Sequence, residues 1–220
     1  GKLGVVRPTF EEYPNRLADD RVVTFIPDNR DFRYGVSDLM AFFEENRVDN
    51  LLLINPDNPT GNFIPLDDLC KLAGWCEAHS VRLILDESFV DFSEAWATSS
   101  FLCDSYLEAY PHLVVVKSIS KSYGVPGLRL GILASADQAL ISSLKRKVSI
   151  WNINSFAEFF MQIFTKYEKD YETACEKFVN VRAEFLKELN TISYLHPMPT
   201  QANFVFCEVL PPFTAQSVAL

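Results

Sequence analysis

Leu113-Val114-Val115-Val116-Lys117-Ser118-Ile119-Ser120-Lys121 joins a run of aliphatic residues directly to a polar turn. The same order occurs twice upstream, where the aliphatic runs 51–54 and 81–85 are each followed by polar residues. Short, nearly continuous aliphatic runs are typical of parallel strands that are buried on both faces. Helical patterns alternate with these runs along the chain. The sequence therefore predicts an α/β fold with a mostly parallel sheet.

Three segments carry helical patterns. Residues 65–76 fit a helix between the first two strands, because Pro65 suits a first turn and the apolar positions fall on one face. Residues 101–110 fit a shorter helix before the third strand. From residue 155 to residue 189 the apolar positions follow steps of three and four, which predicts one long helix or two in tandem.

Residues 128–133 form another apolar run, about a dozen residues after the third strand, which is too few for a helical crossover. We therefore expect this strand to run antiparallel to its neighbour. A further strand is expected at 203–209, where Pro211-Pro212 would end it. We divide the chain into a larger sheet domain, 1–154, and the helical stretch with the start of a smaller domain, 155–220.

The composition of the 220 residues, 48% hydrophobic and 22% charged, is typical of a globular protein. Its 20 basic and 29 acidic residues give a net charge of −9, which disfavours a nucleic-acid partner. No window reaches the roughly 18 apolar residues of a membrane span, and no signal-peptide pattern is visible, so we expect a cytoplasmic protein without a membrane partner. The five cysteines lack C-x-x-C spacing and the three histidines are scattered, so no metal site is expected.

Polar residues follow each of the three strands, at 55–61, 86–88 and 118–121. The carboxyl ends of parallel strands meet at one edge of a sheet, where α/β proteins bind their ligands. Arg129, near the start of the antiparallel strand, would lie at the same edge as Lys121. An amide, a carboxylate, hydroxyls and two cations suit an anionic heteroaromatic cofactor better than a nucleotide.

The motifs N-P-D-N-P-T-G (55–61), D-E-S-F (86–89) and S-I-S-K-S-Y-G-V-P-G-L-R-L-G (118–131) resemble those of class I and II aminotransferases of fold type I, which use pyridoxal 5′-phosphate. Within this family, the chain is most similar to the branch of histidinol-phosphate aminotransferases and threonine-phosphate decarboxylases. The resemblance implies a large cofactor-binding domain, with helices on both faces of a mostly parallel sheet, followed by a small α+β domain.

Carried over residue by residue, the resemblance implies one catalytic lysine and five further cofactor-binding residues. Lys121 would form the Schiff base with the cofactor and move the proton at the substrate α-carbon. Asp86 would keep the pyridine nitrogen protonated, so that the ring can accept electrons. The others would bind the rest of the cofactor: Asn58 the ring hydroxyl oxygen, Arg129 and Ser118 the phosphate, and Phe10 the face of the ring.

Two features depart from the family pattern. Aminotransferases commonly carry a tyrosine where this chain has Phe89, so the ring hydroxyl oxygen would lose a phenol partner. The upstream glycine-containing turn that cradles the phosphate and the downstream arginine that binds the substrate carboxylate are not visible, since the last arginine is Arg182. We therefore expect the 220 residues to be a fragment with incomplete domains.

The resemblance implies an enzyme that transfers the amino group of an amino acid, or of a phosphorylated amino compound, to a 2-oxo acid. Two alternatives stay open: a decarboxylase of an O-phospho-amino acid, and a truncated, non-catalytic module for dimerisation or ligand binding. The expected partners are the small-molecule donor and acceptor and a second copy of the chain. Asn154 would either approach the substrate or cap the following helix.

Overall fold

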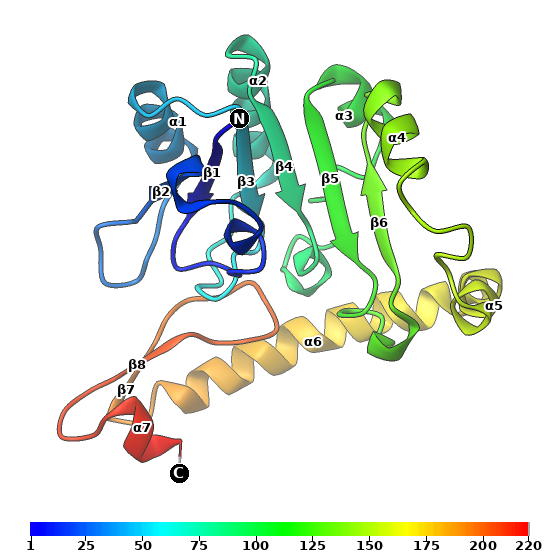
Figure 1. Ribbon diagram of the computed structural model, residues 1–220. Coiled ribbons are helices and arrows are strands. Elements are labelled where there is room, and N and C mark those ends of the chain that lie inside the picture. Colours follow the sequence, from blue (N-terminus) through cyan, green and yellow to red (C-terminus); the bar gives the residue numbers. More distant parts are fainter. Residues whose placement is uncertain (220) are drawn as a thin grey trace.

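The computed structural model describes residues 1–219, and a six-stranded sheet of order β2-β1-β3-β4-β5-β6 lies at their centre (Figure 1). The strands are β1 (Leu3–Val6), β2 (Val22–Phe25), β3 (Asn50–Ile54), β4 (Arg82–Asp86), β5 (Leu113–Ser118) and β6 (Gly131–Ala134). β6 pairs antiparallel with β5, whereas the other neighbours pair in parallel. Both the mostly parallel sheet and its antiparallel strand are thus confirmed.

The register of the three central strands aligns the polar segments that follow them. Ile54 at the end of β3 pairs with Asp86, which in turn pairs with Val116 of β5. Buried aliphatic side chains alternate between the two faces of these strands, which explains their continuous apolar runs. The carboxyl ends of β3, β4 and β5 therefore lie side by side.

Helices α1, α2 and α3 pack on one face of this sheet, and α5 and α6 lie below its carboxyl edge (Figure 1). The α-helices are α1 (Val36–Glu45), α2 (Leu66–Ala78), α3 (Asp104–Ala109), α4 (Gln138–Lys145), α5 (Ser155–Phe164), α6 (Glu168–Leu189) and α7 (Ala215–Val218). Short 3₁₀ helices are η1 (Pro14–Arg16), η2 (Asp19–Arg21), η3 (Val90–Phe92), η4 (Pro126–Leu128) and η5 (Thr165–Tyr167). Within residues 1–219, no helix combines the length and the apolar character that a membrane crossing needs.

The main core lies between the sheet and the first two helices. Leu39 and Phe43 of α1, and Leu69 and Leu72 of α2, are almost completely buried against aliphatic side chains of β3 and β4. The opposite face is partly covered by the segment after β1, where Tyr13 and other side chains pack on Leu3, Val5 and Leu52. The sheet is therefore held from both sides, and its carboxyl edge is left for polar groups.

The helical stretch 155–189 is two helices in tandem, α5 and α6, joined by η5. Asn154 caps α5, because its side chain accepts a hydrogen bond from Ala157 N at 3.0 Å. α6 then runs below the carboxyl ends of the central strands (Figure 1). Phe178 on α6 packs against Phe92 of η3, with ring centroids 4.8 Å apart, so α6 contacts the segment that follows β4.

The strand predicted at 203–209 is wrong in its first half. Only Cys207–Val209 forms a strand, β8, which pairs antiparallel with β7 (Leu195–Pro197). The preceding residues bend toward the sheet instead, where Ala202 is fully buried and Gln201 N donates to Gly61 O at 3.0 Å. The backbone before β8 therefore bonds to the 55–61 turn through Gln201, and Phe206 O accepts from Met198 N at 2.8 Å, directly after β7.

Candidate functional site

A cavity of about 320 Å³ opens at the carboxyl edge of the sheet. All six predicted site residues line it, and they come from segments that are far apart in the sequence. The lining residues are Phe10, Tyr13, Ile54, Asn58, Asp86, Ser88, Phe89, Ser118, Ser120, Lys121, Pro126 and Arg129. The fold thus brings together the residues that the sequence motifs single out.

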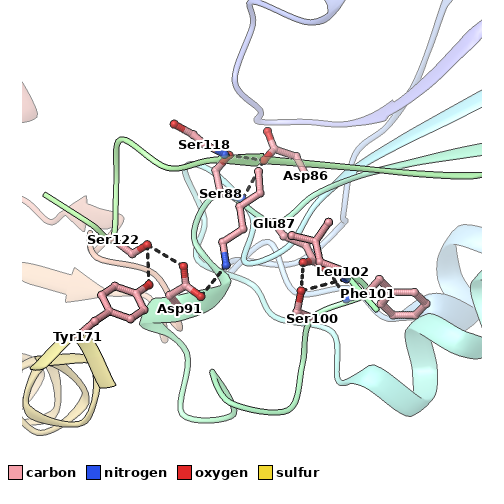
Figure 2. Close-up of polar contacts among 11 residues, drawn as sticks. Asp86, Glu87, Ser88, Asp91, Ser100, Phe101, Leu102, Ser118, Ser122 and Tyr171 are labelled. Carbon is pink, nitrogen blue, oxygen red and sulfur yellow. Dashed lines mark hydrogen bonds and ion pairs between the residues drawn. The ribbon is translucent and has the colours of Figure 1, made fainter. Parts of the chain in front are cut away.

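Asp86, the last residue of β4, is 7% exposed and firmly held. Its Oδ1 accepts hydrogen bonds from Ser88 N at 2.9 Å and from Ser88 Oγ at 2.5 Å (Figure 2). Its Oδ2 accepts one from the Tyr13 hydroxyl at 2.6 Å. A carboxylate has about four acceptor positions, so Oδ2 retains one for a donor in the cavity.

Sequence reasoning missed Tyr13. Burial, followed by the negative charge of Asp86 and the hydrogen bond to it, raises the pKa of Tyr13 above its ordinary value. The phenol therefore stays protonated and donates to the carboxylate. No motif marks this residue, which lies 73 positions from Asp86 in the sequence. The available signal was its place three residues after Phe10 on the same segment, where Tyr13 N donates to Phe10 O at 3.4 Å across a turn.

Lys121 lies on the turn that follows β5, with its side chain exposed toward the cavity. Its ammonium nitrogen is 5.7 Å from the centroid of the Phe89 ring, within the range of a cation–π contact. Phe89 itself is buried and packs edge-to-face on Phe204, with centroids 5.1 Å apart. Lys121 therefore extends over a fixed apolar wall.

Ser118 and Arg129 lie on neighbouring segments because β5 and β6 are antiparallel. Ser118 pairs with Gly131, two residues after Arg129, and Ser118 N donates to Ser88 Oγ at 3.0 Å. Arg129 caps η4 and precedes β6, so it lies just outside the strand predicted from residue 128. Its φ of 57° is in the left-handed region, which is uncommon for a side-chain-bearing residue and turns the chain into β6.

Asn58 and Phe10 complete the lining of the cavity. Asn58 is half-buried on the turn after β3. That turn is fixed by Asn55, whose side-chain amide donates to Ile64 O at 3.0 Å and accepts from Ile64 N at 2.8 Å. Phe10 is 49% exposed and meets Tyr13 edge-to-face, with centroids 6.0 Å apart. The rings of Phe10 and Tyr13 therefore form an aromatic part of the cavity lining.

Glu87, the other acidic residue of the D-E-S-F motif, does not line this cavity, and its side chain points toward Ser100 and Phe101 (Figure 2). It is 1% exposed and accepts hydrogen bonds from Phe101 N at 2.7 Å and Ser100 Oγ at 2.6 Å. Burial is the largest cause that raises the pKa of Glu87. Glu87 thus fixes the loop before α3, whereas Asp86 is available to a ligand.

The arrangement has the chemistry of a site for a flat, anionic, nitrogen-containing ligand. Two cations, Lys121 and Arg129, and the Ser118 hydroxyl can hold an anionic group, because guanidinium and hydroxyl groups donate strongly to phosphate oxygens. Asp86 offers a carboxylate to a protonated nitrogen, and Phe10 offers an aromatic face.

Known proteins of similar sequence include phosphonate and phospho-amino-acid enzymes. The chain is 36% identical over 209 residues to CMP-5′-(3-aminopropyl)phosphonate synthase of Streptomyces rubellomurinus, covering 95% of this chain and 33% of that protein. It is 30% identical over 213 residues to L-serine phosphate decarboxylase of Sulfurospirillum multivorans, covering 94% and 54%. It is 29% identical over 206 residues to histidinol-phosphate aminotransferase of Clostridium novyi, covering 93% and 55%. The chain thus spans between a third and about half of the length of these relatives.

Solved structures confirm the fold class. A decarboxylase from Sulfurospirillum multivorans superimposes with a TM-score of 0.85 at 30% identity, covering 96% of this chain and 61% of that one. L-threonine-O-3-phosphate decarboxylase from Porphyromonas gingivalis has the same fold, with a TM-score of 0.80 at 21% identity, covering 99% and 62%. The expected resemblance to this branch is therefore confirmed, and the fold is that of fold type I pyridoxal-phosphate enzymes.

A family model described as aminotransferase class I and II matches residues 4–219, which is nearly the whole chain. Members of this family use pyridoxal 5′-phosphate, the cofactor that the sequence motifs predict. The cavity at the carboxyl edge has donors and acceptors suited to that molecule. The chain therefore belongs to the class I and II aminotransferases.

Proposed function

We propose that this chain binds pyridoxal 5′-phosphate in the Lys121 cavity and acts on the amino group of a small amino compound. The observation that carries the proposal is the convergence of Phe10, Asn58, Asp86, Ser118, Lys121 and Arg129 on one cavity. The site residues and their roles rest on this convergence together with the family resemblance. The donor set matches the cofactor group by group.

Each polar part of the cofactor has a suitable partner. Arg129 and Ser118 would hold the phosphate through charge-assisted and hydroxyl hydrogen bonds. The remaining acceptor position of Asp86 Oδ2 would take the proton of the pyridine nitrogen. Asn58 would donate to the ring hydroxyl oxygen, and Phe10 would cover the ring face. Lys121 would hold the cofactor through its amine.

The bound cofactor would supply an electron sink that weakens the bonds at the substrate α-carbon. Asp86 would keep the ring nitrogen protonated, and the hydroxyls of Ser88 and Tyr13 keep that carboxylate in place. Lys121, once released by the substrate amine, would move the proton at the α-carbon. The Phe89 ring lies beside the ammonium group of Lys121, with its centroid 5.7 Å from the nitrogen, and presents an apolar surface to it.

The proposed reaction is amino transfer from an amino acid or a phosphorylated amino compound to a 2-oxo acid. Decarboxylation of an O-phospho-amino acid is the second candidate, and two observations favour it. One relative of 30% identity is named as L-serine phosphate decarboxylase, and the 36% identical one is named for a product with a primary amine and a phosphonate. Phe89, which carries no phenol, is compatible with either reaction.

Several broader features belong to the same proposal. The division near residue 154 into a large and a small domain, a homodimeric assembly and a cytoplasmic location would follow from the family's organisation. Because the chain spans a third to about half of these relatives, a non-catalytic module for dimerisation or ligand binding is a third outcome.

Cofactor attachment tests the proposal. The purified chain is incubated with pyridoxal 5′-phosphate, treated with borohydride to make the bond to lysine permanent, digested and analysed by mass spectrometry. We expect one adduct per chain, on Lys121. Lys121→Ala should abolish it, whereas Lys166→Ala, on η5, should leave it unchanged. Equal loss in both variants, or labelling spread over many lysines, would contradict the assignment.

Product analysis then separates the reactions. Amino-group transfer to a 2-oxo acid and release of carbon dioxide from O-phosphoserine are measured in parallel on the cofactor-loaded chain. Transfer alone supports the aminotransferase, and carbon dioxide alone supports the decarboxylase. Neither product from a chain that carries the Lys121 adduct supports the non-catalytic module.

A further inference from the structure

A buried ion pair lies behind the turn that carries Lys121. Lys117 on β5 and Asp91 on η3 have side chains that are 7% and 8% exposed, and Lys117 Nζ donates to Asp91 Oδ1 at 2.7 Å (Figure 2). Neither residue lines the Lys121 cavity. Such a pair often stabilises no more than apolar residues of the same size would, because both charges lose their hydration. Its presence suggests a role in positioning a neighbouring group.

The second oxygen of Asp91 bonds to the residue next to Lys121. Ser122 Oγ donates to Asp91 Oδ2 at 2.7 Å, and the hydroxyl of Tyr171 on α6 donates to Ser122 Oγ at 2.9 Å (Figure 2). Asp91 therefore lies between Lys117 and Ser122. The bonds form a continuous connection from β5 through η3 to the Lys121 turn and on to α6.

Ser122 lies in the middle of a turn whose backbone makes hydrogen bonds of its own. Ile119 N donates to Leu130 O at 3.1 Å, and Gly124 N donates to Lys121 O at 3.2 Å. The side chain of Ser122 adds a bond from this turn to a charged acceptor, and such bonds are stronger than those between neutral groups. Loss of that bond would release Lys121 from its fixed position over Phe89.

We propose that Asp91, balanced by Lys117, is a positioning residue that holds Ser122 and thereby fixes Lys121 in the cavity. Tyr171 extends this connection to α6, where its ring also stacks on Tyr123 at a centroid distance of 4.2 Å. The role in cofactor attachment rests on the proposed function. The hydrogen-bonded connection itself is a property of the chain without cofactor.

The positive charge of Lys117 compensates for the burial of the Asp91 carboxylate. A carboxylate that is almost fully buried stays ionised only if an opposite charge or several donors compensate for its lost hydration. Lys117 supplies that charge, and Asp91 can then accept strongly from Ser122. Truncation of either ionic partner alone would leave an unpaired buried charge, so Ser122 is the safer residue to change.

Ser122→Ala removes the bond to the turn and keeps the ion pair. The matched control is Ser135→Ala, which also removes a half-buried serine that donates a hydrogen bond, to Leu113 O at 2.8 Å, but lies at the other end of the β5–β6 pair. Ser122→Thr keeps a hydroxyl and serves as the rescue. Two quantities are measured: the rate of adduct formation at Lys121, and amide hydrogen exchange without cofactor.

We expect Ser122→Ala to slow adduct formation at Lys121 by about tenfold, the equivalent of one charge-assisted hydrogen bond. Exchange should accelerate in residues 118–124, without cofactor, and not in the rest of the sheet. Ser122→Thr should restore both quantities, and Ser135→Ala should change neither. Unchanged adduct rate and exchange in Ser122→Ala would overturn the proposal.

Asp91 is tested by non-additivity. The double variant Asp91→Leu with Lys117→Met removes both charges and should slow adduct formation as much as Ser122→Ala does. Ser122→Ala added to this double variant should cause no further loss, because all three changes break one connection. If the triple variant formed the adduct more slowly than the double variant, by the factor that Ser122→Ala causes alone, the proposal would be contradicted. A wild-type chain that forms no Lys121 adduct would refute the proposed function, and hydrogen exchange would still decide whether Ser122 holds the turn.

Discussion

Phe89 shows how one residue alters the cavity and leaves the rest of the site in place. Its ring packs on Phe204 and lies beneath the Lys121 ammonium, at 5.7 Å from the ring centroid. A tyrosine there would bring a hydroxyl near the groups that line the cavity. Among the residues proposed to bind the cofactor, Lys121 contacts this ring, whereas Asp86 is held by Ser88 and Tyr13. We therefore expect the phenylalanine to affect how a bound cofactor reacts more than whether it binds.

Asp57, in the turn after β3, should make stability depend on pH. Burial raises the pKa of Asp57 from 3.8 to about 7, although the bond from Thr60 opposes the shift. The unfolded chain releases this proton near pH 4 and the folded chain only near pH 7, so this group lowers the free energy of unfolding as pH rises between them. The loss is on the order of a few kcal/mol.

Asp57→Asn places a side chain that does not titrate at this position. This position should then no longer make the free energy of unfolding depend on pH. We therefore expect the thermal midpoint of the variant, relative to wild type, to increase from pH 5 to pH 8. Asp28→Asn, at an exposed position, is the control and should show no such trend. If the thermal midpoints of Asp57→Asn and wild type changed in parallel with pH, Asp57 would have the same pKa in the folded and the unfolded chain, which contradicts this prediction.

The convergence of the six residues that we propose for cofactor binding could be predicted from the sequence, because each of them belongs to a motif next to a strand. Tyr13 and Asp91 could not be predicted in this way. The role of each depends on a partner brought close by the fold, Asp86 for Tyr13 and Ser122 for Asp91, at separations of 73 and 31 positions. The position of Tyr13 three residues after Phe10 places it near the cavity, but nothing in a single sequence pairs it with Asp86.

At the scale of elements, the 55–61 turn depends on Gly61. Its φ is +73°, in the region that favours glycine, and a Cβ there would collide with the Thr200 side chain. Gly61→Ala should therefore lower the free energy of unfolding by about 2 kcal/mol or more, measured by urea denaturation. Gly74→Ala, inside α2 with open space around its Cβ position, should instead stabilise by about 0.5–1 kcal/mol. Similar losses in both variants would show that the contact with Thr200 is unimportant.

Long or strongly apolar elements were predictable, and short ones were not. The central strands β3, β4 and β5 and the tandem helices have enough periodic residues to be recognised. β1 and β2 have four residues each, too few to distinguish a strand from any short apolar run. The strand at 203–209 was overpredicted because Phe204 packs in the cluster of Phe89 and Phe92, a contact that periodicity does not reveal.

At the scale of the whole molecule, Arg182 connects α6 to η3 and to the bend before β8. It is 5% exposed, and burial is the largest cause that lowers the pKa of Arg182. Its guanidinium donates to Phe92 O on η3, to Ala202 O at 3.4 Å and to Gln201 Oε1 at 3.1 Å. One side chain thus bonds to the segment after β4 and to the bend before β8.

Arg182→Met keeps the length and the apolar stem of the side chain and leaves these acceptors without their donor. We expect a loss of about 3 kcal/mol in the free energy of unfolding, because buried acceptors without partners are costly. Hydrogen exchange should accelerate in residues 198–206 and in η3, while β3 and β4 stay protected. Arg16→Met, which removes an exposed ion pair with Glu12, should change stability by less than about 0.5 kcal/mol. If Arg182→Met accelerated exchange equally over the whole sheet, Arg182 would be part of the common core and not a connection between α6 and the cavity-bearing edge.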